Sequence, residues 1–337
     1  MDSKELRRLL HGYQTARILS ACAEFNLADH LREGPLTVEV LAEREGVVPE
    51  LLRRLIRAAI VLGVFGEDEQ GLIHSTPLSE LLRADHPENL KAVAICFAQP
   101  WVWSAWGELS NCIRTGKTGT ELLYQRTFFE YLAGNPAAHH IFNQIMAGGG
   151  DLNEQIAAAC DLTSVRVVLD IGGGSGSLLC SLLRHAPAAR GVILDLPALA
   201  PEASAAIAAA GLEDRAVFQG GDFFEHIPTG ADLMVLRYIL HDWPDEQGEL
   251  ILRNARASLP PDGQLLVVES LLAAGREVSP RSRFLDIGMV VTTGGRERTL
   301  AEYQVMLERT GFVLEQAMTV HPIYQMTIMR ARAVRGA

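Results

Sequence analysis

Val168-Leu-Asp-Ile-Gly172-Gly-Gly174-Ser-Gly176 is the stretch of this 337-residue chain that decides its fold. An apolar run typical of a buried strand leads directly into alternate glycines, and the residues that follow predict a helix. Glycine there lets the backbone approach a ligand closely, and a helix N-terminus offers free N–H groups. Ser177 stands where a dinucleotide fingerprint requires glycine. The stretch therefore predicts a nucleotide-type site, with a tight turn that holds no ligand as the alternative.

Predicted strands and helices alternate through the C-terminal half of the chain. The predicted strands cover residues 165–171, 191–196, 216–219, 232–236 and 264–269. Helical stretches such as 246–259 lie between them, which indicates a parallel sheet with helices on both faces. A helix over 299–310 then precedes two consecutive strands, 313–320 and 323–329, so at least one edge strand is antiparallel. We predict an α/β fold with a Rossmann-like, mostly parallel sheet and an antiparallel last strand.

The first 90 residues show a different pattern, of helices and one hairpin. Apolar side chains recur at helical spacing from Leu6 to Ala16, Thr37 suits a helix N-cap, and a further helix starts near Glu50. Residues 64–65 and 72–74 flank a polar turn, which predicts a small β-hairpin. This is the pattern of a winged-helix domain, which binds DNA or packs against another chain. Ten Lys and Arg against fifteen Asp and Glu give residues 1–90 a charge of −5, which favours packing or dimerisation.

Composition argues against several classes of protein. The chain is 48% hydrophobic and 21% charged, as in an ordinary globular protein, and its formal charge of −11 argues against a nucleic-acid binder. The five cysteines are widely spaced without a Cys-x-x-Cys pair, so we expect no disulfide framework and a cytoplasmic location. We also expect no signal peptide and no membrane span, because the first residues are charged and no apolar run reaches about 18 residues.

Two carboxylates follow predicted strands beside the glycine motif. Asp195 ends the strand over 191–196, and Asp222 follows the strand over 216–219. At the carboxyl ends of such strands a carboxylate can accept from ribose hydroxyls or from an adenine amino group, and Phe223 can stack on the base. Alone, Asp195 suits a helix cap equally well, and Asp222 suits a surface charge beside core rings. Together with the glycines they favour an adenosine-containing ligand.

His241 is the candidate catalytic base. It comes just after the strand over 232–236, where open α/β sheets build their sites. Glu269 ends the next strand, and Glu297 lies in the polar segment before the helix over 299–310. A carboxylate that accepts from one imidazole nitrogen fixes the tautomer and leaves the other nitrogen as a base. A histidine without such partners is usually structural, so the two glutamates carry this prediction.

The segment between these regions is predicted to be helical and is rich in aromatic side chains. Three of the four tryptophans lie within six residues, Trp103 among them. Ordinary core packing is the alternative for any single ring, but together the rings could line a pocket for a flat ligand. We place the domain boundaries so that residues 1–92 form the winged-helix-like domain, 93–155 a helical connector that contributes to the substrate pocket, and 156–337 the catalytic domain.

Five motifs occur in one order along the chain and are more specific jointly than singly. They are Leu169-Asp-Ile-Gly-Gly-Gly-Ser-Gly176, Gly221-Asp-Phe223, Leu240-His-Asp-Trp-Pro-Asp-Glu246, Val268-Glu-Ser270 and Gly294-Gly-Arg-Glu-Arg-Thr299. With this set the chain resembles the S-adenosylmethionine-dependent small-molecule O-methyltransferases of the plant caffeate and flavonoid type and their bacterial natural-product relatives. The resemblance covers nearly the whole chain and implies a class I methyltransferase sheet, with an N-terminal winged-helix domain that forms an intertwined homodimer.

The resemblance also implies a set of cofactor-binding residues. Gly172 and Gly174 would hold the methionine part of S-adenosylmethionine. Asp195 would bind its ribose, and Asp222 with Phe223 its adenine. Arg237 stands where plant members have lysine, near the carboxylate end of the cofactor.

A second implied set carries the chemistry and the acceptor. His241 would be the catalytic base, flanked by Glu269 and Glu297. The implied substrate pocket is lined by Phe142, Met146, Trp103 and Asp242. An aromatic hydroxyl compound, for instance a phenazine or an aromatic polyketide, is the expected acceptor.

The expected reaction is an in-line displacement that needs no metal. The acceptor oxygen attacks the methyl carbon, S-adenosylhomocysteine leaves, and an imidazole with a pKa near ~6.5 takes the proton of a phenol with a pKa near ~10. The alternatives are N-methylation, a relative that uses the cofactor site for hydroxylation or decarboxylation, and a methyltransferase that uses a divalent metal. A nicotinamide-dependent oxidoreductase is disfavoured by Ser177 and by the lack of a Tyr-x-x-x-Lys pair, and a DNA-binding regulator by the acidic N-terminal domain.

Overall fold

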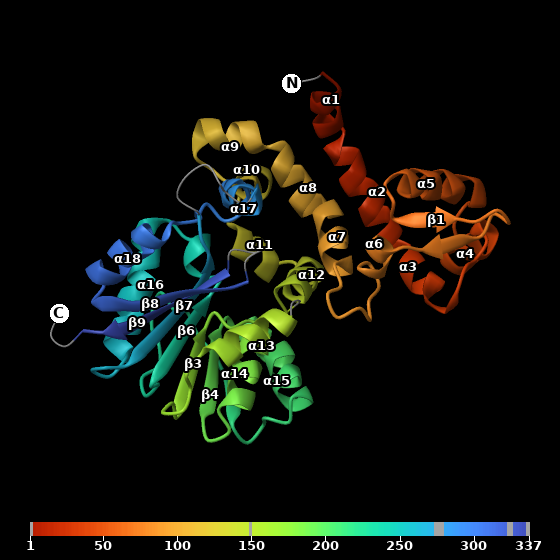
Figure 1. Cartoon of the computed structure of the whole chain (residues 1–337). Helices are drawn as coiled ribbons and strands as arrows, with labels where there is room; N and C mark the ends of the chain where they lie inside the picture. The colour runs from red at the N-terminus through yellow and green to blue at the C-terminus, as the bar shows by residue number, and fades with distance from the viewer. Residues whose placement is uncertain (1–2, 148–149, 273–279, 322–325, 335–337) are drawn as a thin grey trace. The chain divides into compact units, whose positions relative to one another are not determined.

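The computed structural model describes residues 3–147, 150–272, 280–321 and 326–334 (Figure 1). The chain forms two compact units: one runs to Ser104 and takes in the segment that starts at His140, and the other holds Ala105–His139 and the remainder of the chain. Helices α8 (Pro100–Gly107) and α12 (Pro136–Ala147) continue from one unit into the other. The predicted domain boundaries after residues 92 and 155 stay a prediction.

The first unit is built of helices and one small hairpin. Its helices are α1 Ser3–Leu10, α2 Gly12–Glu24, α3 Leu27–His30, α4 Val38–Glu45, α5 Pro49–Val61, α6 Pro77–Glu80 and α7 Lys91–Ala98, with a 3-10 turn at Leu31–Glu33. The hairpin pairs β1 Phe65–Glu67 with β2 Ile73–Ser75 in antiparallel register, as predicted. Thr37 caps α4, because its side chain accepts from the backbone N–H of Val40 at 3.3 Å.

The apolar stripe predicted near the N-terminus lies on the surface of this unit. Leu6, Leu9, Leu10 and Tyr13 are each more than half exposed, although α1 and α2 are helical as predicted. The core of the unit is formed instead by side chains such as Leu27, Leu41 and Ile56. Such a row of exposed large apolar side chains is unusual for a surface that faces water alone.

The second unit is organised around a seven-stranded sheet. The strands are β3 Val167–Ile171, β4 Arg190–Asp195, β5 Ala216–Gly220, β6 Leu233–Arg237, β7 Gln264–Ser270, β8 Phe312–His321 and β9 Met326–Ala333. Their order across the sheet is β5-β4-β3-β6-β7-β9-β8. The first five are parallel, while β9 is antiparallel to both β7 and β8. The predicted mostly parallel sheet with an antiparallel end is thus confirmed, although residues 323–325 of the last predicted strand lie outside the described residues.

Helices cover both faces of this sheet, as the alternating pattern predicted (Figure 1). The helices that follow α8 are α9 Leu109–Thr115, α10 Gly119–Tyr124, α11 Phe128–Ala133, α12 Pro136–Ala147, α13 Gly150–Ala159, α14 Ser177–His185, α15 Ala200–Ala209, α16 Asp245–Ser258, α17 Pro280–Val291 and α18 Leu300–Arg309, and α8 itself is Pro100–Gly107. Consecutive residues of β3 enter opposite cores: Val168 packs with α13, α14 and α15, and Leu169 with α16 and α18.

The order of the strands fixes where a ligand can bind. From β3 the chain builds outward through β4 to β5 and then returns to place β6 on the other side of β3. The carboxyl ends of β3 and β6 therefore flank a topological switch point, where open α/β sheets bind their ligands. In the part of the chain that the structure describes, no helix is long and apolar enough to cross a membrane.

Candidate active site

The glycine motif forms the turn between β3 and α14. Gly172, Gly174 and Gly176 have φ values of +68°, +56° and +76°, which strongly favour glycine. A Cβ atom at Gly172 or Gly176 would also collide with an isoleucine side chain. At Gly174 such an atom would meet no described atom within 4 Å, so this backbone faces open space. The turn at the N-terminus of α14 can therefore receive a ligand closely at Gly174.

Asp195 ends β4 and holds this turn in place. Its Oδ2 accepts from the backbone N–H of Gly174 at 2.7 Å, and its Oδ1 from the N–H of Leu196 at 2.7 Å. Burial raises the pKa of Asp195, although these two N–H groups act in the opposite direction. Each oxygen keeps a further lone pair for a ligand hydroxyl. The carboxylate thus supports the glycine turn, and its binding to a ribose stays a prediction.

Asp222 and Phe223 follow β5. The exposed Asp222 accepts from the backbone N–H of Phe224 at 2.8 Å through Oδ1, so it stabilises the turn that carries both phenylalanines. The Phe223 ring lies close to Gly172: an atom added as Cβ there would be 3.6 Å from its Cε1. Asn254 of α16 donates to the carbonyls of Phe223 and Phe224 at 3.0 and 2.8 Å. The ring is thereby held beside the glycine turn.

A buried carboxyl and a partly buried arginine lie close to the glycine turn. Asp170 of β3 is 2% exposed, and its Oδ2 has no hydrogen-bond partner in the part of the chain described. Burial raises the pKa of Asp170 to about 7, with Arg237 opposing and Asp195 adding to the rise. Nε of Arg237 is likewise buried without a partner. Asp170 was not among the predicted site residues, although it stands only two residues before Gly172.

His241 lies in a 3-10 turn, Leu240–Asp242, that follows β6. Its imidazole is 7% exposed, and Nδ1 is 2.7 Å from Oε1 of Glu297, which is a hydrogen bond. Nε2 lies 3.7 Å from Oδ1 of Asp242, too far for a hydrogen bond. In the neutral imidazole, with Nδ1 donating to the glutamate, Nε2 keeps a free lone pair. The predicted pairing of His241 with Glu297 is present in the structure.

Glu269, at the end of β7, contacts the same turn in another way. Its Oε1 accepts from the backbone N–H groups of Ile239, Leu240 and His241 at 3.2, 2.9 and 3.3 Å. Its Oε2 is 3.8 Å from Nδ1 of the imidazole and has no hydrogen-bond partner among the described residues. Glu269 therefore fixes the backbone that carries His241 and adds a charge beside the ring, while Glu297 makes the direct bond.

These carboxylates control the protonation of the imidazole. Burial lowers the pKa of His241, but the three neighbouring carboxylates outweigh this effect and raise the pKa to about 10. Burial also raises the pKa of Glu269 to about 7 and that of Asp242 to about 6. The sequence led us to expect an imidazole pKa near ~6.5. The shift arises because the chain places three acidic side chains around one ring.

Tyr238 is a further residue at this turn that sequence reasoning missed. Its φ of +54° is rare for a residue other than glycine, and its ring stacks on the imidazole of His241 with centroids 5.2 Å apart. Strained backbone of this kind often marks functional sites. Phe142, Met146 and Trp103 belong to the first compact unit, and their part in a substrate pocket stays a prediction.

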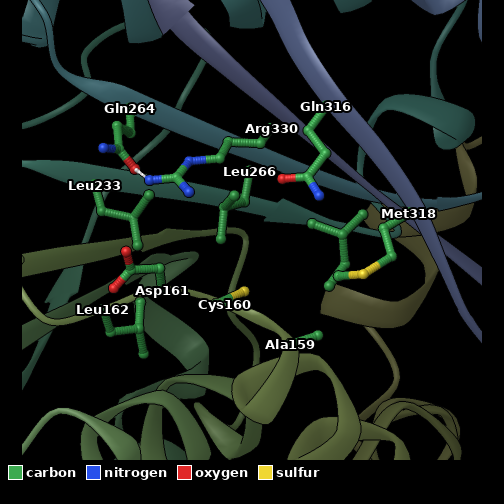
Figure 2. Close-up of a pocket in the computed structure, with 11 residues that line it drawn as sticks. Ala159, Cys160, Asp161, Leu162, Leu233, Gln264, Leu266, Gln316, Met318 and Arg330 are labelled. Carbon is green, nitrogen blue, oxygen red and sulfur yellow. Dashed lines mark hydrogen bonds between the residues drawn. The ribbon is translucent and has the colours of Figure 1, made fainter.

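A small cavity lies at the other end of the sheet (Figure 2). Leu233 and Gln264, at the amino ends of β6 and β7, line it together with Arg330, which donates to Gln264 at 2.7 Å. Its volume of about 30 Å³ has room for one or two water molecules and not for an aromatic substrate. Within the described ranges, no group of three or more His, Cys, Asp or Glu side chains could hold a metal ion.

Two protein families match this chain. The family model of the O-methyltransferase domain matches residues 106–313, and that of the O-methyltransferase dimerisation domain matches residues 7–85. Phenazine O-methyltransferase PhzM of Lysobacter antibioticus is 36% identical over 317 residues, which are 94% of this chain and 92% of the relative.

Solved structures agree with the sequence matches. The structure of LaPhzM superposes with a TM-score of 0.92 at 35% identity, covering 98% of this chain and 99% of the other. A second structure is that of the O-methyltransferase NcsB1 from neocarzinostatin biosynthesis, in complex with S-adenosylmethionine and 2-hydroxy-5-methyl naphthoic acid. It superposes with a TM-score of 0.81 at 31% identity, covering 95% of this chain and 96% of the other.

Relatives at similar identity have names that imply other chemistry. Aclacinomycin 10-hydroxylase RdmB of Streptomyces purpurascens is 34% identical over 323 residues, 94% of this chain and 86% of the relative. An 8-amino-8-demethylriboflavin N,N-dimethyltransferase of Streptomyces davaonensis is 32% identical over 315 residues, which are 92% of this chain and 89% of the relative. Overall identity therefore does not by itself separate the alternatives.

Proposed function

Since the chain belongs to the O-methyltransferase family, as its motifs predicted, we propose that it methylates a hydroxyl of an aromatic small molecule with His241 as the base. The protein is an S-adenosylmethionine-dependent O-methyltransferase with a class I methyltransferase fold. One relative is named for a phenazine, and another is solved with a naphthoic acid bound. They support a polycyclic aromatic acceptor from the biosynthesis of a natural product such as an antibiotic.

The observation that carries the catalytic role is the 2.7 Å bond between Nδ1 of His241 and Oε1 of Glu297. This bond selects the tautomer whose Nε2 is unprotonated, and it stabilises the imidazolium that forms when Nε2 takes a proton. Glu269 supports the same state by holding the backbone of the turn. The carboxylates thus orient a base and do not take up the proton themselves.

The residues at the glycine turn fit the cofactor. The open space at Gly174, the donors at the start of α14 and the carboxylate of Asp195 suit a ligand that combines a methionine with an adenosine. In this proposal Gly172 and Gly174 contact the methionine part, Asp195 the ribose, and Asp222 with Phe223 the adenine. The partly buried Arg237 would hold the cofactor's carboxylate. S-adenosylmethionine, when bound, supplies an electrophilic methyl group bonded to a positively charged sulfur.

His241 performs the proton transfer in this proposal. Nε2 of His241 would lie against the acceptor hydroxyl and would take its proton as that oxygen receives the methyl group, which S-adenosylmethionine would supply and S-adenosylhomocysteine would leave behind. The neighbouring carboxylates raise the pKa of His241, which favours uptake of a phenol proton by its imidazole. General-base help of this type contributes roughly 10²–10⁴-fold.

The acceptor pocket is proposed from the aromatic and polar side chains predicted for it. Asp242 lies beside the imidazole in the structure, with its Oδ1 3.7 Å from Nε2. Phe142 and Met146 are four residues apart on α12, one helical turn, so their side chains share one face of the helix. Together with Trp103 they would contact a flat ring system. In this proposal residues 1–92 form the dimerisation domain, residues 93–155 a helical connector that contributes to the substrate pocket, and residues 156–337 the catalytic domain.

A homodimer through the N-terminal residues is the proposed assembly. The dimerisation family model covers residues 7–85, and Leu6, Leu9, Leu10 and Tyr13 expose a row of apolar side chains on α1 and α2. A second copy of the chain would bury this row, whose exposure to water is unfavourable. Replacing Leu6, Leu9 and Leu10 with serine should yield a monomer in light scattering, whereas a variant that stays dimeric would contradict this interface.

A cytoplasmic location is proposed from the cysteines. All five carry free thiols and four of them are buried, a usage that suits a reducing compartment. We propose no nucleic-acid partner, because the net charge of −11 opposes contact with phosphates.

Labelled S-adenosylmethionine tests the proposed reaction. The chain is incubated with it and with matched acceptors that share one tricyclic scaffold and differ only in carrying a hydroxyl, an amine or a methyl ether. We expect one label on the hydroxyl compound, S-adenosylhomocysteine in equal amount, and no reaction of the ether. Transfer to the amine alone would favour N-methylation, and an added oxygen without label would favour hydroxylation. Either of these results would overturn the proposal.

A further inference from the structure

We propose that Arg298 is a positioning residue for methyl transfer, because its guanidinium fixes the turn that carries His241 against the segment that carries Glu297. The inference rests on the roles proposed for those two residues. Arg298 is fully buried and is among the largest buried side chains in the described part of the chain. By comparison, the side chain of Arg296, two residues earlier in the sequence, is 43% exposed.

The guanidinium binds the backbone on both sides of the imidazole. Nη1 of Arg298 donates to the carbonyl of Leu240 at 2.8 Å, and Nη2 donates to the carbonyl of Trp243 at 2.8 Å. These two carbonyls bracket the residues that include His241. A single rigid group therefore fixes both ends of the turn.

The other contacts of Arg298 tie it to the rest of the unit. Nε and Nη2 both donate to Oδ1 of Asp245, at 2.9 and 2.7 Å. Its own carbonyl accepts from the N–H of Leu272, just beyond β7, at 3.0 Å. The guanidinium also lies 5.7 Å from the centroid of the Tyr303 ring in α18. The position of the arginine is thus set by elements other than the turn it holds.

The segment before Arg298 follows the same backbone closely. Arg296 donates its N–H to the carbonyl of His241 at 2.9 Å. Gly295 approaches so near that a Cβ there would lie 2.0 Å from that carbonyl oxygen. Glu297 follows these two residues directly, and its own N–H donates to Oδ1 of Asp286 at 3.0 Å. The carboxylate of Glu297 consequently meets the imidazole only while the two backbone segments stay in register.

The choice of arginine follows from the number of donors required. A buried guanidinium is costly unless its N–H groups are bonded, and those of Arg298 reach three carbonyls and one carboxylate oxygen. Lysine keeps the charge but offers three donors without the planar fork. The conservative change Arg298→Lys should therefore loosen the turn while it preserves the charge near Asp245.

The test compares Arg298→Lys with Arg296→Lys. Both arginine side chains contact Asp245, but of the two only the side chain of Arg298 donates to carbonyls of the turn. For Arg298→Lys we expect kcat to fall roughly 10- to 100-fold, as for a small displacement of catalytic groups, with unchanged affinity for S-adenosylmethionine. For Arg296→Lys we expect kcat within about twofold of the unchanged chain, because a half-exposed ion pair contributes little.

The pH profile separates positioning from mere stabilisation. The charged and titratable groups that face the imidazole are Glu297, Glu269 and Asp242, with the Tyr238 ring stacked on it. If Arg298 holds Glu297 in place, Arg298→Lys moves the acid limb of kcat/KM to lower pH, because the imidazole loses a partner that raises its pKa. A lower melting temperature with an unshifted pH profile would make Arg298 merely structural and overturn the inference.

A double-mutant cycle with Glu297→Gln distinguishes the two proposals. If Arg298 acts through Glu297, Arg298→Lys costs much less in the Glu297→Gln background than alone. Equal costs in both backgrounds would overturn the inference, while a Glu297→Gln variant with normal kcat and pH profile would overturn the proposed function itself. Asp245→Asn provides a second route should Arg298→Lys fail to fold, since Asp245 is about half exposed, and it should shift the pH profile in the same direction.

Discussion

The glycine turn and the His241 turn lie at the carboxyl ends of neighbouring strands, β3 and β6, yet they are built in opposite ways. The glycine turn is local: Gly174 and Asp195 come from adjacent strands, and the contact between them is a backbone N–H. The His241 turn is assembled from three distant segments, and the carboxylates of two of them, Glu269 and Glu297, lie beside the titratable imidazole. The first arrangement suits binding of a cofactor, and the second suits control of a proton.

The sharpest way to break this comparison is to remove the imidazole. His241→Ala should lower kcat by roughly 10²–10⁴-fold, because the general base is lost, while the affinity for S-adenosylmethionine stays unchanged. Steady-state kinetics and calorimetry measure the two quantities, and His226→Ala, at an exposed histidine, is the matched control. Parallel loss of turnover and cofactor affinity would identify His241 as a structural residue.

Removal of Asp195 should have the converse effect. Asp195→Ala deletes the acceptor of two short N–H bonds and the predicted ribose contact, so the affinity for S-adenosylmethionine should fall roughly 10- to 100-fold. At saturating cofactor, kcat should recover most of its value. Asp214→Ala, at an exposed carboxylate before β5, serves as the control. An unchanged dissociation constant by calorimetry would refute the ribose assignment.

A smaller change isolates the role of the carboxylate partner. The neutral imidazole is the active form, so kcat/KM should rise with pH toward the pKa of His241, about 10. Glu297→Gln removes a negative charge that raises this pKa, so the acid limb should move to lower pH. The maximum of kcat should fall as well, because the amide no longer favours the imidazolium. An acid limb that stays in place, or that moves to higher pH, would be inconsistent with the pairing.

The smallest effect is expected from metal removal. The site residues are assigned to the cofactor, the proton and the acceptor, and none of them is assigned to a metal. The rate measured after dialysis against EDTA should therefore equal the rate before it. A loss of activity that added Mg²⁺ restores would instead favour the metal-dependent alternative.

The same contrast explains what the sequence could and could not predict. The glycine spacing and the alternating strands encode local geometry, so the sheet, its antiparallel end and the position of Asp195 followed from short patterns. His241, Glu269 and Glu297 could be named because each follows a strand or lies in a family motif. Their distances could not, since they depend on how three separate segments pack.

The site residues that were not predicted from the sequence were missed for a shared physical reason. Asp170 and Arg298 are charged, and charged residues are usually exposed, so nothing in the local pattern indicated that both would be buried. The positive φ of Tyr238 arises from the tertiary structure around β6 and has no signature in residue type. The raised pKa of His241 has the same origin, because it needs Glu269 and Glu297, from distant parts of the chain, beside the ring together with the adjacent Asp242.

A crystal structure with S-adenosylhomocysteine and a hydroxylated polycyclic acceptor tests the central claim most directly. We predict that Nε2 of His241 lies within about 2.6–3.2 Å of the acceptor hydroxyl and that Glu297 is still hydrogen-bonded to Nδ1. An acceptor bound with its hydroxyl beyond reach of the imidazole, or an imidazole turned away from the cofactor, would contradict it.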